Sequence, residues 1–200
     1  DGVEHLFVDL RFYGGGSTDA AGARVRHLIA EAYETSSFGE VRTVPFSADL
    51  RDAVTTWDNS LFEATQAMFD RQPNGRWRFR DDDVMTVEPA PEHFRGRVTL
   101  LSSSANSSGS TMLLGELQQR AGLMVVGEPT GGNIEGCTAG TIVFCELPNS
   151  GVRIRVPLIK TVTGLEADSP GTGVTPDVVV PVTAGSFFAG RDEALEAAMR

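Results

Sequence analysis

Lysine is almost absent from this chain of 200 residues, and so is any excess of positive charge. Lys160 is the single lysine among 17 basic residues, and 27 acidic residues give a net charge of −10. A protein that binds nucleic acid as its main partner needs a basic face for the phosphates. The composition therefore argues against nucleic acid, and it leaves few choices for a catalytic lysine.

Cysteine and long apolar runs are also scarce. Cys137 and Cys145 are too few to define a zinc site or a disulfide framework, so a disulfide between them and two buried thiols both stay open. No run approaches the roughly 18 apolar residues of a membrane-spanning helix. No signal peptide precedes the first strand pattern, which begins at Val3. We therefore expect the chain to be a piece of a longer protein.

The order of apolar runs and helical patterns predicts an α/β domain. With 40% hydrophobic residues, the chain has the composition of a soluble globular protein. Apolar runs predict strands at 3–10, 97–104 and 123–127, and helical spacing predicts helices over 20–33 and 108–122. A helix between two consecutive strands implies a parallel crossover, which places this part of the chain in the α/β class.

The remaining segments are less regular. We expect a strand at 40–46, a helix at 61–72 that ends in a Gln-Pro-Asn-Gly turn, a β-hairpin over 140–159, a strand at 173–182 and a helix at 191–200. The polar segment 73–92 contains the acidic run Asp81, Asp82 and Asp83. Three adjacent carboxylates do not converge on one ion without further ligands, so we interpret this run as a solvated loop.

A serine-rich turn, Ser-Ser-Ala-Asn-Ser-Ser-Gly-Ser-Thr at 103–111, separates an apolar strand pattern from a helical one. Ser108 lies where the strand gives way to the helix, close to backbone N–H groups that can stabilise an oxyanion. Gly109 lets a substrate approach the backbone. Serines at such turns are commonly helix caps, so catalysis and capping both remain readings of Ser108.

A glycine triplet forms a second turn after a strand. Gly14, Gly15 and Gly16 leave backbone N–H groups unshielded, which suits phosphate binding or an oxyanion hole as well as a tight turn before a helix. Ser17, Thr18 and Asp19 follow as candidate helix caps. Asp19 stands where the Gly-x-Gly-x-x-Gly fingerprint needs its last glycine, so a dinucleotide site is not indicated.

These segments together resemble the tail-specific, or C-terminal processing, serine peptidases. "VDLRFYGGG" resembles that family's "DLRxNxGG" element, and "TLLSSSANSSGSTMLLGELQQRAGLMVVGEPTGG" resembles its strand, serine turn, helix and strand. "GVTPDVVV" and "GRDEALEAAM" resemble its closing segment. The resemblance covers residues 3–17 and 95–200 in order, whereas 36–90 matches poorly and suggests a variable insertion or lid within one peptidase core domain over 1–200.

The resemblance implies a crotonase-like α/β core with an open sheet, flanking helices and a β-hairpin. It gives Ser108 the role of nucleophile, and it gives the backbone N–H groups of Gly109 and of the Gly14–Gly15 turn the role of oxyanion hole. It implies a peptide or unfolded protein as substrate, no metal or organic cofactor, a PDZ domain upstream that this chain lacks, and a periplasmic or other extracytoplasmic location.

The chain departs from the family pattern at the general base. Many members use a lysine 25 residues after the serine, and counting from Ser108 reaches Asn133, which cannot accept a proton at neutral pH. Four residues further on, where that subgroup often has glutamine, stands Cys137. The nucleophile still needs a base, which typically contributes about 10²–10⁴-fold in rate.

Four alternatives stay open for the base. A tricorn-type arrangement would take a histidine from an upstream segment and orient it with Glu166 or Asp168. Lys160 would serve if it lies on the apolar face that residues 152, 154, 156 and 158 form by alternation, because burial lowers the pKa of a lysine. His5, His27 or His93 would be a local base. The last alternative is that the chain has none.

Two functions from different classes follow. The first is a serine endopeptidase that cleaves unfolded or C-terminal peptide segments through an acyl-enzyme on Ser108. The second is a catalytically inactive relative that binds extended peptides along a sheet edge, and Asn133 motivates it. A crotonase-like acyl-CoA enzyme is a weaker third reading, because an acidic chain offers few basic residues for the adenine-phosphate group.

Overall fold

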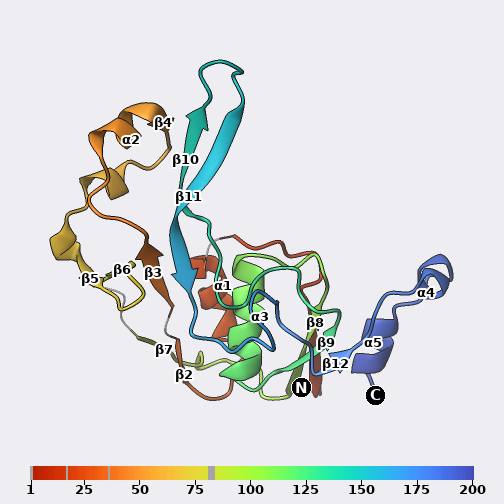
Figure 1. The fold of residues 1–200 in the computed structure, drawn as a ribbon. Helices are drawn as coiled ribbons and strands as arrows, with labels where there is room; N and C mark the ends of the chain where they lie inside the picture. The colour runs from red at the N-terminus through yellow and green to blue at the C-terminus, as the bar shows by residue number, and fades with distance from the viewer. Residues whose placement is uncertain (1, 17, 36, 81–83) are drawn as a thin grey trace. The chain divides into compact units, whose positions relative to one another are not determined.

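The computed structural model describes residues 2–16, 18–35, 37–80 and 84–200, and Figure 1 draws them as a ribbon. They divide into two units. Unit 1 comprises 1–35, 84–135 and 164–200, and unit 2 comprises 36–83 and 136–163. The segment 36–83 therefore does not form a unit alone but folds together with 136–163. The α/β class predicted from the sequence is confirmed.

Unit 1 is built on a parallel sheet. The strands of unit 1 are β1 (His5–Asp9), β2 (Tyr33–Thr35), β7 (Met85–Val87), β8 (Arg97–Ser102), β9 (Met124–Gly127) and β12 (Val178–Val179). Its helices are α1 (Thr18–Val25), α3 (Gly109–Gln119), α4 (Ala184–Phe188) and α5 (Glu193–Ala198). The sheet order is β1-β8-β9-β12 with every pair parallel, and β2 and β7 form a separate antiparallel pair. The predicted crossover from β8 through α3 to β9 is confirmed.

The core of unit 1 lies between its parallel sheet and α3. Leu114 and Leu117 of α3, Leu100 of β8 and Val125 of β9 are all 0% exposed. Leu114 and Leu117 lie three residues apart and therefore share one helix face. Burying each leucine contributes about 1.5–3 kcal/mol to folding. This packing fixes α3, and with it the serine turn at its N-terminus, against the sheet.

Unit 2 is an antiparallel sheet with short helical turns. Its elements are β3 (Phe38–Val41), α2 (Ala48–Ala53), β4 (Val54–Thr55), η1 (Ser60–Glu63), η2 (Gln66–Met68), β5 (Phe69–Arg71), β6 (Trp77–Phe79), β10 (Gly140–Glu146) and β11 (Arg153–Val162). The sheet order is β4-β10-β11-β3-β6-β5. Val41, Leu61 and Phe69 form the centre of its own core. The predicted hairpin is confirmed as β10 and β11, the long pair in Figure 1.

Two predicted helices are wrong in extent or type. The helix expected over 20–33 ends at Val25, and Tyr33 instead pairs with Val87 in the β2–β7 ribbon. The helix expected over 61–72 is replaced by η1, η2 and strand β5. Ala64, with ψ 134°, and Thr65, with ψ 159°, are extended and interrupt it. In both places strand pairing and core packing override the helical spacing of the sequence.

Two predicted strands are shorter than expected. The strand predicted over 40–46 is β3, which ends at Val41 ahead of a cis Val44–Pro45 bond. The strand predicted over 173–182 contains only Val178–Val179 as β12. Before β12 the chain follows a loop in which Val174 donates its N–H to Thr130 Oγ1 at 2.9 Å. Contacts with the segment after β9 therefore replace sheet pairing over most of that stretch.

The structure tests the predictions about the cysteines, membrane-spanning helices and metal sites. Cys137 and Cys145 are both free and half-buried, so the disulfide alternative is wrong and the thiols are less buried than expected. Ser17 and the acidic run at 81–83 lie outside the described residues. In the described part of the chain, no helix is long and apolar enough to cross a membrane, and no group of histidine, cysteine and acidic residues has the arrangement of a metal site.

Candidate active site

Ser108 lies in a strained turn between β8 and α3. Its backbone has φ 53° and ψ −128°, a region that residues other than glycine rarely occupy. It stands at the N-cap position of α3, but its side chain makes no capping hydrogen bond with the helix. The residue is half-buried. A strained strand-to-helix turn that presents a serine hydroxyl is the geometry of a nucleophile elbow.

The neighbouring serines are less suited to this task. Ser103 Oγ donates to the Arg11 carbonyl at 2.5 Å, and Ser104 Oγ donates to Glu128 at 3.2 Å. Ser107 Oγ donates to the Gly14 carbonyl at 3.0 Å. Ser110 is 0% exposed and therefore cannot meet a substrate. Ser108 is thus the serine of this turn with the most suitable position for chemistry.

The two glycine-bearing turns lie against each other. Gly15 has φ +108°, and a Cβ on it would lie 2.8 Å from the Ser107 carbonyl oxygen and 2.9 Å from the Gly109 nitrogen. A Cβ on Gly109 would lie 3.0 Å from the Gly16 carbonyl oxygen. Only glycine satisfies both the positive φ and this close approach at position 15. The structure therefore brings together Ser108, Gly109 and the Gly14–Gly15 turn, as the sequence predicted.

A third turn, which follows β9, completes the surroundings of the serine. A Cβ on Gly132 would lie 2.9 Å from the Ser107 Cα and 3.1 Å from the Ser108 nitrogen. Asn133, at the position of the family's lysine, comes directly after this contact. Its side-chain oxygen accepts a hydrogen bond from the Glu135 N–H at 2.8 Å. Asn133 is thus next to the serine turn in space, but its amide has a structural role.

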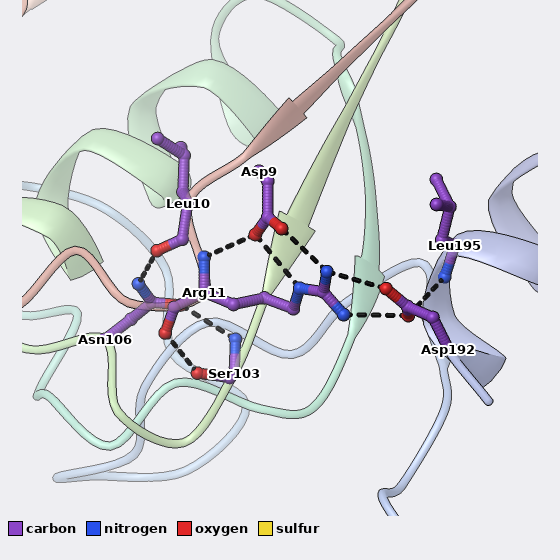
Figure 2. A network of polar contacts seen from close by, with 7 residues as sticks. All are labelled: Asp9, Leu10, Arg11, Ser103, Asn106, Asp192 and Leu195. Atoms are coloured by element: carbon purple, nitrogen blue, oxygen red, sulfur yellow. Dashed lines mark hydrogen bonds and ion pairs between the residues drawn. The ribbon is translucent and has the colours of Figure 1, made fainter. Parts of the chain in front are cut away.

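Asn106 connects these three turns, and sequence reasoning missed it. Its side-chain amide donates to the carbonyls of Leu10 at 2.6 Å and Tyr13 at 3.0 Å, and its oxygen accepts from the Ser103 N–H at 2.8 Å. Figure 2 shows its bonds to Leu10 and Ser103. The Asn106 carbonyl also accepts from the N–H groups of Gly131 and Gly132, each at 3.0 Å. The residue is 0% exposed.

Arg11 forms a second network at the same sheet edge, which sequence reasoning also missed. Its guanidinium lies between the carboxylates of Asp9 and Asp192, with the shortest contacts at 2.6 and 2.8 Å (Figure 2). Hydrogen bonds from Arg11 hold the pKa of both aspartates below the usual range, and the two carboxylates raise the pKa of Arg11. All three groups are therefore charged at neutral pH.

The histidines do not reach the serine turn. His5 opens β1 and pairs in register with Arg97, the first residue of β8, whereas Ser108 follows the other end of β8. The six residues of β8 span about 17 Å. The His27 carbonyl accepts the N–H of Phe94, just ahead of β8, and His93 bonds to Ala90 there. All three histidines therefore lie near the start of β1 and β8, whereas Ser108 follows the other end of β8, and they have no contact with Ser108.

Glu166 lies at the other end of α3 from Ser108. The Glu166 N–H donates to Gln119 Oε1 at 2.9 Å, and its carbonyl accepts from Gln119 Nε2 at 2.8 Å. Gln119 is the last residue of α3, which rises about 15 Å from Gly109. Glu166 and Asp168 are both exposed and line one shallow hollow there. The structure does not bring either carboxylate into contact with the serine.

Lys160 belongs to unit 2. It lies in β11, opposite Glu40 of β3 in the antiparallel register. Most of the apolar face expected on this strand is exposed, because Val152 is 54%, Ile154 41% and Val156 39% exposed, whereas Leu158 is half-buried and packs against the core of unit 2. Lys160 itself is half-buried. The Glu40 carboxylate forms an ion pair with Arg76 at 3.7 Å, so only the strand register places Lys160 beside Glu40.

Comparison with known proteins gives matches to peptidases. A model of peptidase family S41 matches residues 1–180. The structure of mature CPAF complexed with lactacystin aligns with TM-score 0.63 and 18% identity, over 98% of this chain and 43% of that chain. A candidate peptidase from Parabacteroides merdae aligns with TM-score 0.59 and 18% identity, over 98% of this chain and 51% of that one.

A third similar structure, a candidate S41 protease from Bacteroides fragilis, has TM-score 0.51 and 14% identity, over 98% of this chain and 44% of that chain. No curated protein sequence gave a significant match. The chain spans about half or less of the length of these solved structures. At 14–18% identity, the structural alignments show a shared fold alone, and the match over residues 1–180 shows the family. The chain belongs to peptidase family S41.

Proposed function

We propose that this chain forms the core of a serine endopeptidase with Ser108 as nucleophile. The Ser108 oxygen attacks a peptide carbonyl carbon while its proton passes to a general base. The resulting tetrahedral oxyanion collapses, the base returns the proton to the leaving amine, and an acyl-enzyme remains. Water then hydrolyses the ester and frees the serine. This sequence of steps needs no metal or organic cofactor.

One observation carries the proposal: the strained Ser108 lies in a turn, next to Gly109, whose backbone packs against the backbone of the Gly14–Gly15 turn. The N–H of Gly109 and an N–H of the Gly14–Gly15 turn are the proposed oxyanion donors. The N-terminus of α3 adds positive potential at the same place. Losing one such donor typically costs about 10²–10³-fold in rate, so the close packing of these turns is catalytically valuable.

We place the general base outside unit 1. Its three histidines lie toward the opposite sheet edge, and Asn133 is neutral and bonded to Glu135. A histidine supplied by another part of the whole protein, as in the tricorn-type arrangement, fits this geometry best. Glu166 lies about one length of α3 away from the serine. Its predicted orienting role therefore requires a further polar group between it and that histidine.

The proposed substrate is an unfolded or C-terminal peptide segment. The family and the structural neighbours support a peptide substrate in general. The finer assignment follows from the likeness to the C-terminal processing peptidases seen in the sequence. An extracytoplasmic location and a lid role for the segment around 36–90 stay predictions.

A second function, a peptide-binding module without catalysis, is favoured by a specific observation. The lysine position holds Asn133, and no histidine of unit 1 reaches Ser108. β1 is an edge strand of the parallel sheet, and an extended peptide can add to such an edge. Binding without turnover is the expected behaviour if the whole protein supplies no base.

Hydrolysis of an unfolded protein substrate by the whole protein tests the proposal. We expect cleavage by the wild type and loss of at least about 10³-fold in kcat for Ser108→Ala, with substrate binding retained. Ser104→Ala is the matched control, because its exposed hydroxyl in the same segment bonds to Glu128 and to neither glycine turn. Equal cleavage by wild type and Ser108→Ala contradicts the assignment, and binding without cleavage by the wild type supports the second function.

A further inference from the structure

Two carboxylates hold Arg11 just before the chain enters the Gly14–Gly15 turn (Figure 2). Nη1 and Nη2 of Arg11 donate to the two Asp192 oxygens, each at 2.8 Å. Nε and Nη2 donate to the two Asp9 oxygens at 2.9 and 2.6 Å. The guanidinium is therefore bound in bidentate fashion on two sides, which fixes its plane as well as its position.

The backbone of Arg11 is held as firmly as its side chain. Its N–H donates to Asp9 Oδ1 at 3.1 Å, and its carbonyl accepts from Ser103 Oγ at 2.5 Å. The Tyr13 N–H donates to the Leu10 carbonyl at 2.8 Å and closes a turn around Arg11. Gly14 follows three residues after Arg11, within about 11 Å of it at full extension. The path of the chain into the glycine turn thus depends on where Arg11 is fixed.

Asp192 gives this arrangement a rigid anchor. It is the N-cap of α5, and its Oδ1 also accepts the Leu195 N–H at 3.0 Å. α5 packs on the sheet through Ala198, which shares a core cluster with Leu101 of β8 and Val126 of β9. Asp192 and Arg11 are 181 residues apart in sequence. A short C-terminal helix is thereby connected to the start of the glycine turn.

The exposure of these groups shows what the arrangement contributes. The side chains of Arg11, Asp9 and Asp192 are 22%, 46% and 37% exposed. Ion pairs this close to solvent add little to global stability, because water already stabilises the separated charges. A doubly bidentate geometry at such a site mainly restricts the positions that the backbone can take.

We infer that Arg11 is a positioning residue for the proposed oxyanion turn, and that Asp192 on α5 acts through it. The inference rests on the proposed function, because it assigns the Gly14–Gly15 amides their role at the oxyanion. Arg11 does not touch the substrate in this account. It sets the direction from which those amides approach the carbonyl oxygen above Ser108, and a shift of about 1 Å there can cost about 10²-fold in rate.

The test uses Asp192→Asn in the whole protein, with Glu196→Gln as a matched control. Asparagine keeps the helix cap as well as aspartate does but loses the charge facing Arg11. Glu196→Gln weakens the ion pair between Glu196 of α5 and Arg191, which precedes the helix, and this pair does not involve β1. Two readouts are measured: hydrogen exchange at the Tyr13 amide, which bonds to the Leu10 carbonyl and closes the turn around Arg11, and kcat and KM for a peptide substrate.

We expect Asp192→Asn to speed exchange of the Tyr13 amide about tenfold and to lower kcat about tenfold with little change in KM. Arg11→Lys keeps the charge but loses the planar fork, so it should reproduce both effects, and the double variant should be no worse than either single one. Glu196→Gln should leave both readouts unchanged.

Unchanged exchange at the Tyr13 amide in Asp192→Asn and in Arg11→Lys overturns the inference, whether or not the protein is active. Faster exchange without a fall in kcat, in an active wild type, also overturns it, because the turn then moves without consequence for the reaction. An inactive wild type contradicts the proposed function alone, and the exchange measurement still decides whether Asp192 holds the turn through Arg11. If Asp192→Asn fails to fold, Arg11→Lys carries the test.

Discussion

At the scale of single residues, Asn106 makes hydrogen bonds to more parts of the candidate site than Ser108 does. Its amide satisfies the carbonyls of Leu10 and Tyr13, and it is 0% exposed. Asn106→Ala should therefore lower the free energy of unfolding by about 2–3 kcal/mol, because it leaves buried acceptors without donors. Urea denaturation measures this. Ser104→Ala, at an exposed position of the same turn, should stay within about 0.5 kcal/mol of wild type.

Gly15 is the residue at which backbone shape should matter most for reactivity. A Cβ there meets the Ser107 carbonyl oxygen at 2.8 Å, and φ is +108°. Gly15→Ala should lower the rate of Ser108 acylation by at least about 10²-fold, since the proposed donors move away from the oxyanion. Gly22→Ala, where a Cβ meets nothing within 4 Å, is the control and should keep the wild-type rate. Equal rates for both variants would refute this role of Gly15.

The sequence could predict the positions of Ser108, Gly109 and the glycine turn because their signals are local, whereas their proposed catalytic roles came from the resemblance to the C-terminal processing peptidases. A strand pattern, a glycine and a helix pattern in succession place those residues at one sheet edge. It could not predict Asn106 or Arg11 as site residues. Their partners lie 96 and 181 residues away, and no local pattern distinguishes these side chains from ordinary loop polar groups.

At the scale of secondary-structure elements, we expect His5, which links β1 to β8, to make the stability of the fold depend on pH. His5 Nε2 lies 2.9 Å from Thr99 Oγ1, and desolvation together with the charge of Arg97 lowers the pKa of His5 below 6.5. The folded protein thus binds this proton less readily than the unfolded chain. Stability is full above pH 6.5 and falls as the pH drops from there toward the folded pKa.

His5→Gln should remove this contribution, so the difference in unfolding free energy between pH 7 and pH 5.5 should be smaller in the variant than in wild type. Chemical denaturation at the two pH values measures it. An identical pH dependence in both proteins would show that His5 is not the responsible group. His93→Gln is the control, because His93 lies in a loop and its Nδ1 bonds to the nearby Ala90 carbonyl.

Elements with a clear apolar period were predictable, and those shaped by distant pairing were not. α3 was predicted because Leu114 and Leu117 share one buried face and Gly122, with φ +67°, follows its end. The segment 61–72 has similar spacing but folds as short turns and β5, because Phe69 packs on Phe79 of β6. The spacing of apolar residues within the segment gives no information about that cross-strand contact.

At the scale of the whole molecule, the chain alternates between two units. Unit 1 is assembled from three separate segments and unit 2 from two. The pairing of 36–83 with 136–163 brings β3 beside β11 through more than 100 intervening residues, as in the register of Val162 with Phe38. No periodic pattern in the sequence predicts such a long-range strand pairing. The sequence therefore predicted the order of the site's elements but not the division of the chain.

The most direct test of the account is the site of covalent labelling by a fluorophosphonate on the whole protein, mapped by mass spectrometry. We expect one adduct on Ser108 that disappears in Ser108→Ala and persists in Ser104→Ala, since Ser108 combines the strained turn with the packed backbones of Gly109 and the Gly14–Gly15 turn. An adduct on a different serine, or no adduct on the folded and substrate-binding wild type, would contradict Ser108 as the nucleophile.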